Sequence, residues 1–277
     1  MSHADLFSSI PPLRLGIVPY LNVQPLVYGL AEACPQLQLT PAPPSQLQRM
    51  LVEGEADLGI APTFCAFANE GLGILPAPGI ASDGDVFSVL VVAREPLASL
   101  RRLWRDPHSV TSNALTAILI RRCWGGRIEL TNAPAGDSLE PDDLPAGTGR
   151  VLIGDPAIRT RARYSEIIDL GRTWREWTGL PFVFAAWIGP VGTRTGSLGE
   201  ALRLLRERNA ERLEEVAAAY GGLPDVSVAE RTRYLRENLS FRFGARERQA
   251  VERFHAESKA AGLIRPDALL RWIGEEE

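Results

Sequence analysis

The feature that most constrains the fold of this chain is the alternation of short apolar runs with helix-length amphipathic segments. Apolar runs short enough for buried strands stand at residues 13–18, 58–61, 87–92, 128–130, 151–153, 167–170 and 182–187, and residues 74–78 are expected to be extended. Helical segments are expected between them, as at residues 22–25, 45–53, 96–104 and 114–120. Strands that alternate with helices are typical of an α/β protein with largely parallel sheets.

Local signals mark where several of these helices begin and end. Asn22 can cap a helix that has Pro25 in its first turn, and Ser45-Gln-Leu-Gln48 has the form of a capping box, with Gly54 suited to the position after the helix. Asp155 followed by Pro156 is expected to be another cap. Residues 132–150 carry Pro, Gly and Asp at the density of a loop.

The last third of the chain differs from the rest. From Gly196 onward apolar residues recur at helical spacing, and residues 234–243 are the one ambiguous stretch. We therefore expect two α/β lobes joined by crossings near residues 92–95 and 189–193, with the C-terminal helices packed on the first lobe. Lobe 1 would comprise residues 1–93 and 191–277, and lobe 2 residues 94–190. Ligands of open α/β sheets bind beyond the carboxyl ends of strands, so the expected site is the cleft between the lobes.

Composition excludes several classes of function. Thirty Lys and Arg against thirty-four Asp and Glu, with no basic block, argue against a nucleic-acid binder. Lys259 is the only lysine, so a Schiff-base mechanism would have to use it. There is no GxGxxG or P-loop motif for a nucleotide.

A metal site is also disfavoured, because neither the cysteines nor the histidines are clustered in the sequence. The cysteines and histidines show no CxxC, HxH or HExxH spacing: Cys34, Cys65, Cys123, His3, His108 and His255. We expect no metal and no cofactor. No secretory signal and no stretch long enough to span a membrane is visible, so the expected location is the cytoplasm, without a membrane partner.

Polar side chains gather where strands end or helices begin. They are Asn22, Thr63, the Ser82-Asp83-Gly84 turn with Ser88, and the Ser109, Thr111 and Ser112 cluster. Each of them could be only a cap or turn former. Together at one cleft they would form a wall of neutral donors suited to a small carboxylate ligand.

Several segments, in order, carry a specific resemblance: LGIVPYLNVQPLVYGL, EGEADLGIAPTFCAF, GIASDGDVFSVLVVAREPL, DPHSVTSNALTAILIRR, VLIGDPAIR and DLGRTWREWTGLPFVFAAW. Over residues 13–187 the chain resembles the futalosine-pathway family of menaquinone-biosynthesis enzymes, with a periplasmic-binding-protein type II fold, and within it the chorismate dehydratase branch. The chain departs from the family pattern at Thr63-Phe64-Cys65-Ala66, where the family usually reads close to SIEY. PYLN also replaces the commoner SYLN.

The resemblance implies a lyase that converts chorismate to 3-[(1-carboxyvinyl)oxy]benzoate with loss of water. Asn22 and Ser82 match positions of the active site and are assigned here as catalytic. The expected substrate-binding residues are Tyr20, Thr63, Asp83, Gly84, Ser88, Ser109, Thr111, Ser112 and Asp155. Thr111 and Ser112 match the N-terminus of a helix in the second lobe, where the macrodipole favours a carboxylate.

The chemistry requires a base for a ring proton and a donor for the leaving hydroxyl. Because the expected pocket offers no evident His or Lys base, we expect catalysis by positioning, with the substrate's own side-chain carboxylate taking the proton. Asp83, Asp85 and Asp155 are rival bases, and His108 is interpreted as a loop residue. Phe182, Phe184 and Trp187 alternate at strand spacing and are expected in the core.

Two other functions stay open at this point. One is a non-catalytic solute-binding protein for a small organic anion, which would share the fold and the cleft. The other is the sister branch that makes 1,4-dihydroxy-6-naphthoate, which typically opens with a CPND-type segment that is absent here. The sequence leaves the oligomeric state undetermined.

Overall fold

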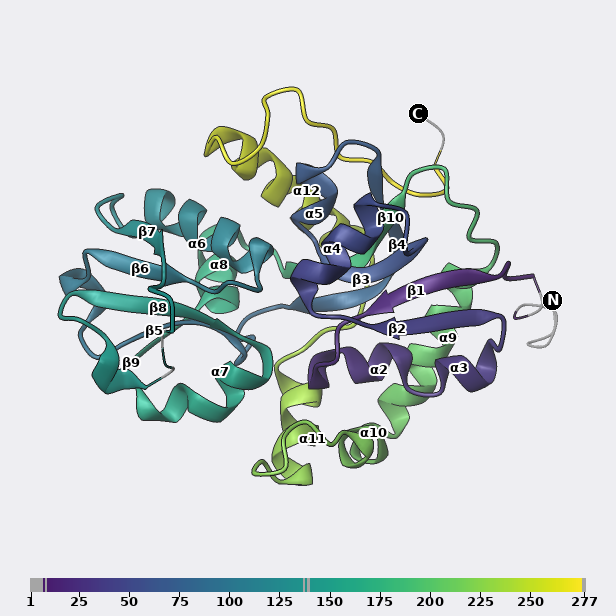
Figure 1. Ribbon diagram of the computed structural model, residues 1–277, viewed down its shortest axis with the longest axis horizontal. Helices are drawn as coiled ribbons and strands as arrows, with labels where there is room; N and C mark the ends of the chain where they lie inside the picture. Colours follow the sequence, from purple (N-terminus) through teal and green to yellow (C-terminus); the bar gives the residue numbers. More distant parts are fainter. Residues whose placement is uncertain (1–6, 8, 137, 139, 276–277) are drawn as a thin grey trace.

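The computed structural model describes residues 7, 9–136, 138 and 140–275, and it divides into two lobes that lie side by side (Figure 1). Each lobe is built around a five-stranded sheet covered by helices. The predicted two-lobed α/β fold is confirmed. His3, one of the residues considered above, lies outside the described residues.

The sheet of the first lobe has the strand order β2-β1-β3-β10-β4. Its strands are β1 (Leu13–Ile17), β2 (Leu37–Pro41), β3 (Leu58–Pro62), β4 (Leu72–Ser82) and β10 (Phe182–Pro190). β1 runs parallel to β2 and β3, whereas β10 is antiparallel to both β3 and β4. Every residue of β3 is buried, as expected for a central strand covered on both faces.

The sheet of the second lobe has the order β7-β6-β8-β5-β9. Its strands are β5 (Val89–Ala93), β6 (Arg102–Arg105), β7 (Glu129–Asn132), β8 (Thr148–Ile153) and β9 (Glu166–Asp169). β6 is parallel to β7 and β8, and β5 is antiparallel to β8 and β9. Both sheets are therefore mixed rather than largely parallel, because each contains a strand that enters from the other lobe and runs against its neighbours.

Helices cover both faces of both sheets (Figure 1). In the first lobe α4 and α5 lie on one face with α12, while α9 packs on β4 from the other side together with α2. In the second lobe α6 and α8 cover one face and α7 the other. The helices are α2 (Gln24–Val27), α3 (Leu30–Ala33), α4 (Pro44–Val52), α5 (Cys65–Ala68), α6 (Val110–Arg122), α7 (Gly154–Thr160), α8 (Leu170–Thr178), α9 (Leu198–Glu211), α10 (Leu213–Ala219), α11 (Val228–Glu237) and α12 (Ala245–Ala260), with 3₁₀ turns η1 (Leu21–Val23), η2 (Leu97–Ser99), η3 (Pro141–Asp143) and η4 (Arg161–Arg163).

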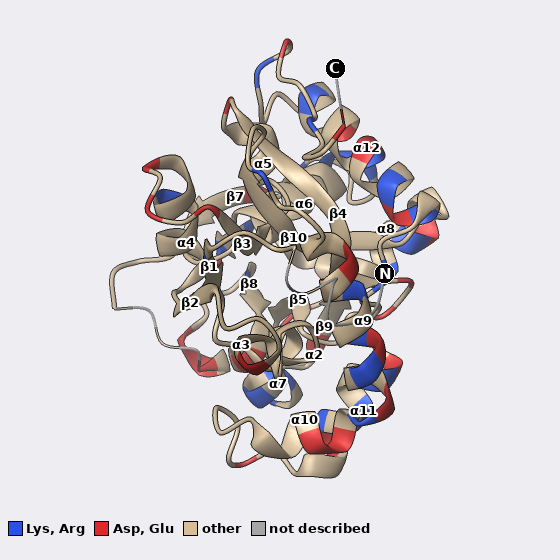
Figure 2. Cartoon of the chain, turned by 90° about the vertical axis from the view of Figure 1, so that its right-hand side faces the viewer, with Lys and Arg blue, Asp and Glu red and all other residues tan. Residues whose placement is uncertain are grey.

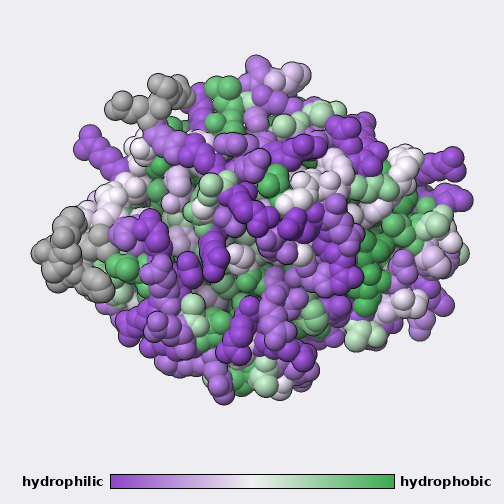
Figure 3. Space-filling model, turned by 180° about the vertical axis from the view of Figure 1, so that it is seen from behind, coloured by the Kyte–Doolittle hydropathy of each residue, from purple (hydrophilic) through white to green (hydrophobic). Residues whose placement is uncertain are grey.

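An aromatic cluster joins the two lobes. The ring of Phe182 in β10 lies 5.1 Å from that of Trp174 in α8 and 4.9 Å from that of Phe254 in α12, and all three are fully buried. Charged residues lie on the outer helices and loops, whereas the strands at the centre carry few of them (Figure 2). Hydrophilic residues cover most of the rear face (Figure 3). No helix among the described residues is long and apolar enough to cross a membrane.

The crossings between the lobes differ from the predicted ones. β4 ends at Ser82 in the first sheet and β5 begins at Val89 in the second, so the outward crossing is residues 83–88 rather than 92–95. The return lies at residues 179–181, because β10 belongs to the first sheet, rather than at 189–193. The predicted lobe boundaries at residues 93 and 190 each assign one strand to the wrong lobe. An apolar run identifies a buried strand but carries no information about its pairing partner.

Several local predictions are also wrong. Residues 96–104 form η2 followed by β6 rather than one helix, and β8 begins inside the stretch expected to be a loop. β2 and α8 were not predicted. α4 begins after Pro43 with no side-chain cap, so the expected capping box at residues 45–48 does not form. In the ambiguous stretch α11 ends at Glu237, and Ser240 then pairs with Ala81 at the edge of the first sheet.

Gly189 of β10 provides a test of this packing. A Cβ atom on Gly189 would lie 2.3 Å from the backbone oxygen of Asp57 and 2.9 Å from Leu58 Cδ2. Gly189→Ala is expected to lower the free energy of unfolding by about 1–3 kcal/mol, because the strand must shift to accommodate the methyl group. Urea denaturation measures this effect. Gly192→Ala is the control, since no heavy atom lies within 4 Å of its Cβ position; equal stability of the two variants would contradict the assignment of Gly189 to a packed central strand.

Candidate active site

A cleft of about 530 Å³, including the part open to solvent, lies between the lobes. Its polar lining comes from both sides: Tyr20, Asn22, His108, Ser109, Thr111 and Ser112. Apolar side chains supply much of the remaining wall, among them Ile60, Ile80, Val89, Ile153 and Phe184. Small-molecule sites are mostly apolar with a few convergent polar groups, and the lining of this cleft has that composition.

The second-lobe wall of the cleft is the N-terminus of α6. Ser109 caps this thirteen-residue helix, since its Oγ accepts the Ser112 N–H at 3.2 Å. The Ser109 hydroxyl donates to Ser112 Oγ at 2.7 Å, which leaves the hydroxyl hydrogen of Ser112 to another acceptor. The first turn holds no acidic residue. The positive end of the helix dipole and the hydroxyls therefore favour an anionic group here.

Thr111, in the first turn of α6, also joins the lobes. Its Oγ1 accepts the backbone N–H of Phe64 from the first lobe at 3.0 Å. Because that bond uses a lone pair of the oxygen, the hydroxyl hydrogen of Thr111 can still be donated to a carboxylate. Thr111 can thus bind a ligand in the conformation in which the lobes are in contact.

Asn22 lies on the first-lobe wall, in η1. It is not the helix cap that the sequence suggested, since the residue before α2 is Val23 and that position has no side-chain cap bond. Its Oδ1 is buried and has no hydrogen-bond partner among the described residues. A buried polar atom without a partner is uncommon in folded proteins, so it is a candidate for a ligand contact.

Tyr20 packs against the other lobe at Gly154. A Cβ on Gly154 would lie 3.1 Å from the Tyr20 ring, and Gly154 has a φ of +59°, so both space and backbone favour glycine there. Burial raises the pKa of the Tyr20 hydroxyl, and the carboxyl groups of Asp106 and Asp155 raise it further. Tyr20 is therefore protonated at neutral pH and available as a donor.

Asp155 lies inside the first turn of α7 rather than capping it, so the predicted cap is wrong. It is 8% exposed and accepts the backbone N–H of Leu21 at 3.3 Å and the hydroxyl of Tyr220. Burial raises the pKa of its carboxyl, an effect that these two hydrogen bonds oppose. Asp155 thus holds the second lobe against the segment that carries Asn22.

The remaining predicted site residues lie outside the cleft lining. Ser82 donates to the Gly84 carbonyl at 3.1 Å, and Asp83 pairs with Arg175 and Arg246 at 2.6 and 2.9 Å. Thr63 is fully buried and donates to the Val183 carbonyl at 2.8 Å. Ser88 is fully buried 2.7 Å from the Tyr234 hydroxyl. These residues support the walls of the cleft and the connection between the lobes.

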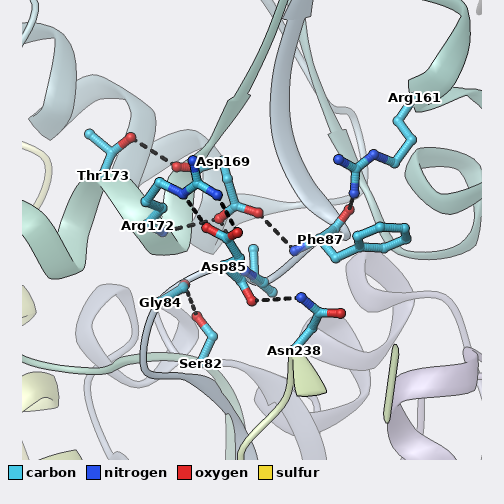
Figure 4. A network of polar contacts seen from close by, with 10 residues as sticks. Ser82, Gly84, Asp85, Phe87, Arg161, Asp169, Arg172, Thr173 and Asn238 are labelled. Atoms are coloured by element: carbon cyan, nitrogen blue, oxygen red, sulfur yellow. Dashed lines mark hydrogen bonds and ion pairs between the residues drawn. The ribbon is translucent and has the colours of Figure 1, made fainter. Parts of the chain in front are cut away.

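The outward crossing, which follows Ser82 and begins with Asp83 and Gly84, is held by a polar network (Figure 4). The Asp169 carboxylate accepts the N–H groups of Val86 and Phe87 at 3.1 and 2.8 Å and that of Arg172 at 3.0 Å. Asp85, a rival base above, forms an ion pair with Arg172. The pKa of Asp85 is lowered, chiefly by its hydrogen bond with Arg172. A paired carboxylate at this crossing lies away from the cleft wall.

The family model described as "Menaquinone biosynthesis" matches residues 13–260.

The chain belongs to this menaquinone-biosynthesis family.

Curated relatives point to one branch of the menaquinone-biosynthesis family. A chorismate dehydratase of Thermus thermophilus is 32% identical over 228 residues, which cover 75% of this chain and 81% of the relative. A chorismate dehydratase of Campylobacter jejuni is 27% identical over 186 residues, 67% of this chain and 68% of the relative.

Solved structures that are similar to this family member share its fold at low identity. The periplasmic aliphatic sulphonate binding protein SsuA from Escherichia coli superposes with a TM-score of 0.63 at 15% identity, covering 96% of this chain and 94% of that one. Protein AF1704 from Archaeoglobus fulgidus gives 0.64 at 15% identity, with 91% and 98% covered. These likenesses support the predicted periplasmic-binding-protein-like fold.

Sequence reasoning missed several residues of the site in this menaquinone-biosynthesis family member. His108 lies in the loop between β6 and α6, as interpreted, and also lines the cleft. Phe184 reaches the cleft, while Phe182 and Trp187 are core as expected. Tyr220 and Tyr234 belong to the C-terminal third, to which no site residue was assigned. A single tyrosine near or within an amphipathic helix carries no signal that would have identified it.

The link through Asp155 is open to a stability test. Asp155→Ala would leave the buried Leu21 N–H without its acceptor and would release Tyr220, which should lower the free energy of unfolding by about 1–3 kcal/mol. Asp142→Ala is the control, because Asp142 is 92% exposed and lies 3.7 Å from Arg94. Urea denaturation of both variants decides the matter: a change below about 0.5 kcal/mol for Asp155→Ala would show that this contact does not hold the lobes together.

Proposed function

We propose that the protein is a carbon–oxygen lyase that dehydrates chorismate to 3-[(1-carboxyvinyl)oxy]benzoate in menaquinone biosynthesis. The observation that carries the proposal is that an anion-favouring helix terminus faces the Asn22 amide oxygen, which has no partner among the described residues, across one small, largely apolar cleft. Family membership and the names of the curated relatives support the same reaction. A cytoplasmic location, predicted above, stays part of this proposal.

The reaction needs few side-chain functions. One ring C–H bond and the ring C–OH bond break, a ring double bond forms, and the proton and hydroxide leave as water. Since the product ring is aromatic, the elimination is strongly favoured. The protein has to hold the diene in one orientation and stabilise the departing oxygen, which hydrogen bonds in a water-poor cleft can do.

We assign the residues by their position in the cleft. Thr111 and Ser112, with the N-terminus of α6, bind a carboxylate of the substrate. Asn22 orients the reacting carbons and the leaving hydroxyl from the opposite wall. The enolpyruvyl carboxylate of the substrate takes the ring proton, with His108 as the rival base. The predicted contact of Ser82 with substrate stays a prediction; its hydroxyl here donates to Gly84.

The assay that tests the function is incubation of purified protein with chorismate. We expect loss of the diene absorbance and appearance of an aromatic product lighter than chorismate by one water. Binding without turnover would instead support a solute-binding protein. This alternative stays open because SsuA, a binding protein, has a similar fold. Neither binding nor turnover of chorismate would favour the sister naphthoate synthase.

Substitution of Asn22 tests its role. Asn22→Ala is expected to lower kcat roughly a hundredfold while KM changes little, because the amide acts mainly on the reacting carbons. Gln46→Ala, which removes an exposed amide from α4, is the control and should leave both constants unchanged. Wild-type turnover by Asn22→Ala would remove Asn22 from the catalytic set.

Substitution of Thr111 tests carboxylate binding. Thr111→Val keeps the shape of the side chain but removes the hydroxyl, so KM for chorismate should rise about tenfold with a smaller change in kcat. Thr116→Val makes the same change farther along α6, where the hydroxyl donates only to the Ser112 carbonyl at 2.8 Å. The assignment fails if the two variants have equal KM values.

A further inference from the structure

The hydroxyl of Tyr234 is buried where the first lobe, the crossing and the C-terminal helices meet. Tyr234 lies in α11 and is 3% exposed. Its hydroxyl is 2.7 Å from the Oγ of Ser88, which is fully buried directly before β5. The Tyr234 ring packs 5.9 Å from the ring of Phe87. Burial raises the pKa of the phenol, so the hydroxyl keeps its proton and can both donate and accept.

The segment that carries Asn22 lies next to this tyrosine, because Tyr234 and Leu21 line one small cavity. Burial raises the pKa of the Tyr234 phenol, and a hydrogen bond with the Asn22 side chain opposes that rise. The Oδ1 of Asn22 is buried without any partner among the described residues. An amide has one donor end and one acceptor end. If the NH₂ group donates to the Tyr234 oxygen, the Tyr234 hydroxyl donates to Ser88 Oγ, and the amide oxygen is left for the cleft that Asn22 lines.

We infer that Tyr234, supported by Ser88, is a positioning residue that holds the Asn22 amide with Oδ1 directed at the substrate. This inference rests on the proposed function, because it gives Asn22 the catalytic role. Tyr234 acts only through Asn22 and does not line the cleft. It makes the C-terminal helices part of the active site, although the residues that contact substrate come from the rest of the chain.

The backbone around Asn22 is held by other groups, which isolates the contribution of Tyr234. The Leu21 N–H is bound by Asp155 at 3.3 Å, and the Val23 N–H donates to the Tyr20 carbonyl at 3.2 Å. Rotation of the Asn22 side chain is therefore the main freedom left to this segment. Tyr234→Phe would keep the ring packing against Phe87 and would remove only the restraint on that rotation.

Kinetics of single and double variants test the inference. Tyr234→Phe is expected to lower kcat for chorismate about tenfold with KM within about twofold, the size of effect that one buried hydrogen bond has. Ser88→Ala should lower kcat in the same direction by less. In an Asn22→Ala background Tyr234→Phe should cost nothing further, because the amide that it positions is gone.

Tyr28→Phe is the matched control. It also removes a tyrosine hydroxyl hydrogen bond, here 2.9 Å from Glu215 on the outer surface, and should leave kcat unchanged. If Tyr234→Phe acted only by weakening the fold, its loss of kcat would recur in the Asn22→Ala background. Additive losses, or wild-type kcat in a folded Tyr234→Phe enzyme, would overturn the inference.

A measurement without substrate separates this inference from the proposed function. The side-chain amide signals of Asn22 in the ¹H–¹⁵N spectrum, assigned by their loss in Asn22→Ala, should shift and broaden in Tyr234→Phe and stay in place in Tyr28→Phe. Unchanged Asn22 signals in Tyr234→Phe would overturn the positioning role. Failure of the wild-type protein to consume chorismate, with the signals shifted as expected, would overturn the function and leave the Tyr234–Asn22 contact standing.

Discussion

The arrangement of the whole molecule depends on the carboxylate of Asp169. It accepts the N–H groups of Val86 and Phe87 in the crossing segment and that of Arg172 at the start of α8. Phe87 has a left-handed φ of +67°, which a bulky residue adopts only when its surroundings enforce it. Arg161 lies 3.8 Å over the Phe87 ring and donates to its carbonyl at 3.2 Å. Because β5 begins two residues later, these contacts set the direction in which the chain enters the second sheet.

The sequence predicts the class of fold but not which strands belong to which lobe, because the place where the chain crosses is set by contacts between distant residues. Most strands that are continuous apolar runs, such as β3 and β5, can be identified from the sequence. β6 cannot, since its two central residues are buried between Arg102 and Arg105 and resemble the end of a helix. The exchange of β5 and β10 between lobes results from pairing over long distances in sequence. Hydrophobic periodicity describes a single segment and cannot report such pairing.

The residues of the candidate site also fall into those that a local sequence pattern predicts and those that it does not. The Ser109, Thr111 and Ser112 cluster could be predicted because a cap followed by an apolar helix is a local pattern, and the structure places all three on the cleft. Ser82, Asp83 and Gly84 form an equally good local pattern but serve the crossing, since turn residues are preferred wherever a strand ends. Tyr220 contacts Asp155, and Tyr234 contacts Ser88, only through the packing of α11 and the segment after α10, which no local pattern records.

The composition of the cleft wall bears on the choice of base. No Lys or Arg is among the described residues that line the cleft, although the proposed substrate is a dianion. A neighbouring cation would lower the pKa of a substrate carboxylate and make it a poor proton acceptor. Neutral hydroxyls and the α6 terminus can bind one carboxylate, while apolar neighbours such as Ile60, Ile80 and Phe184 raise the basicity of the other through desolvation. If the substrate binds in this cleft as proposed, a described lining without Lys or Arg favours proton transfer to the substrate's own carboxylate.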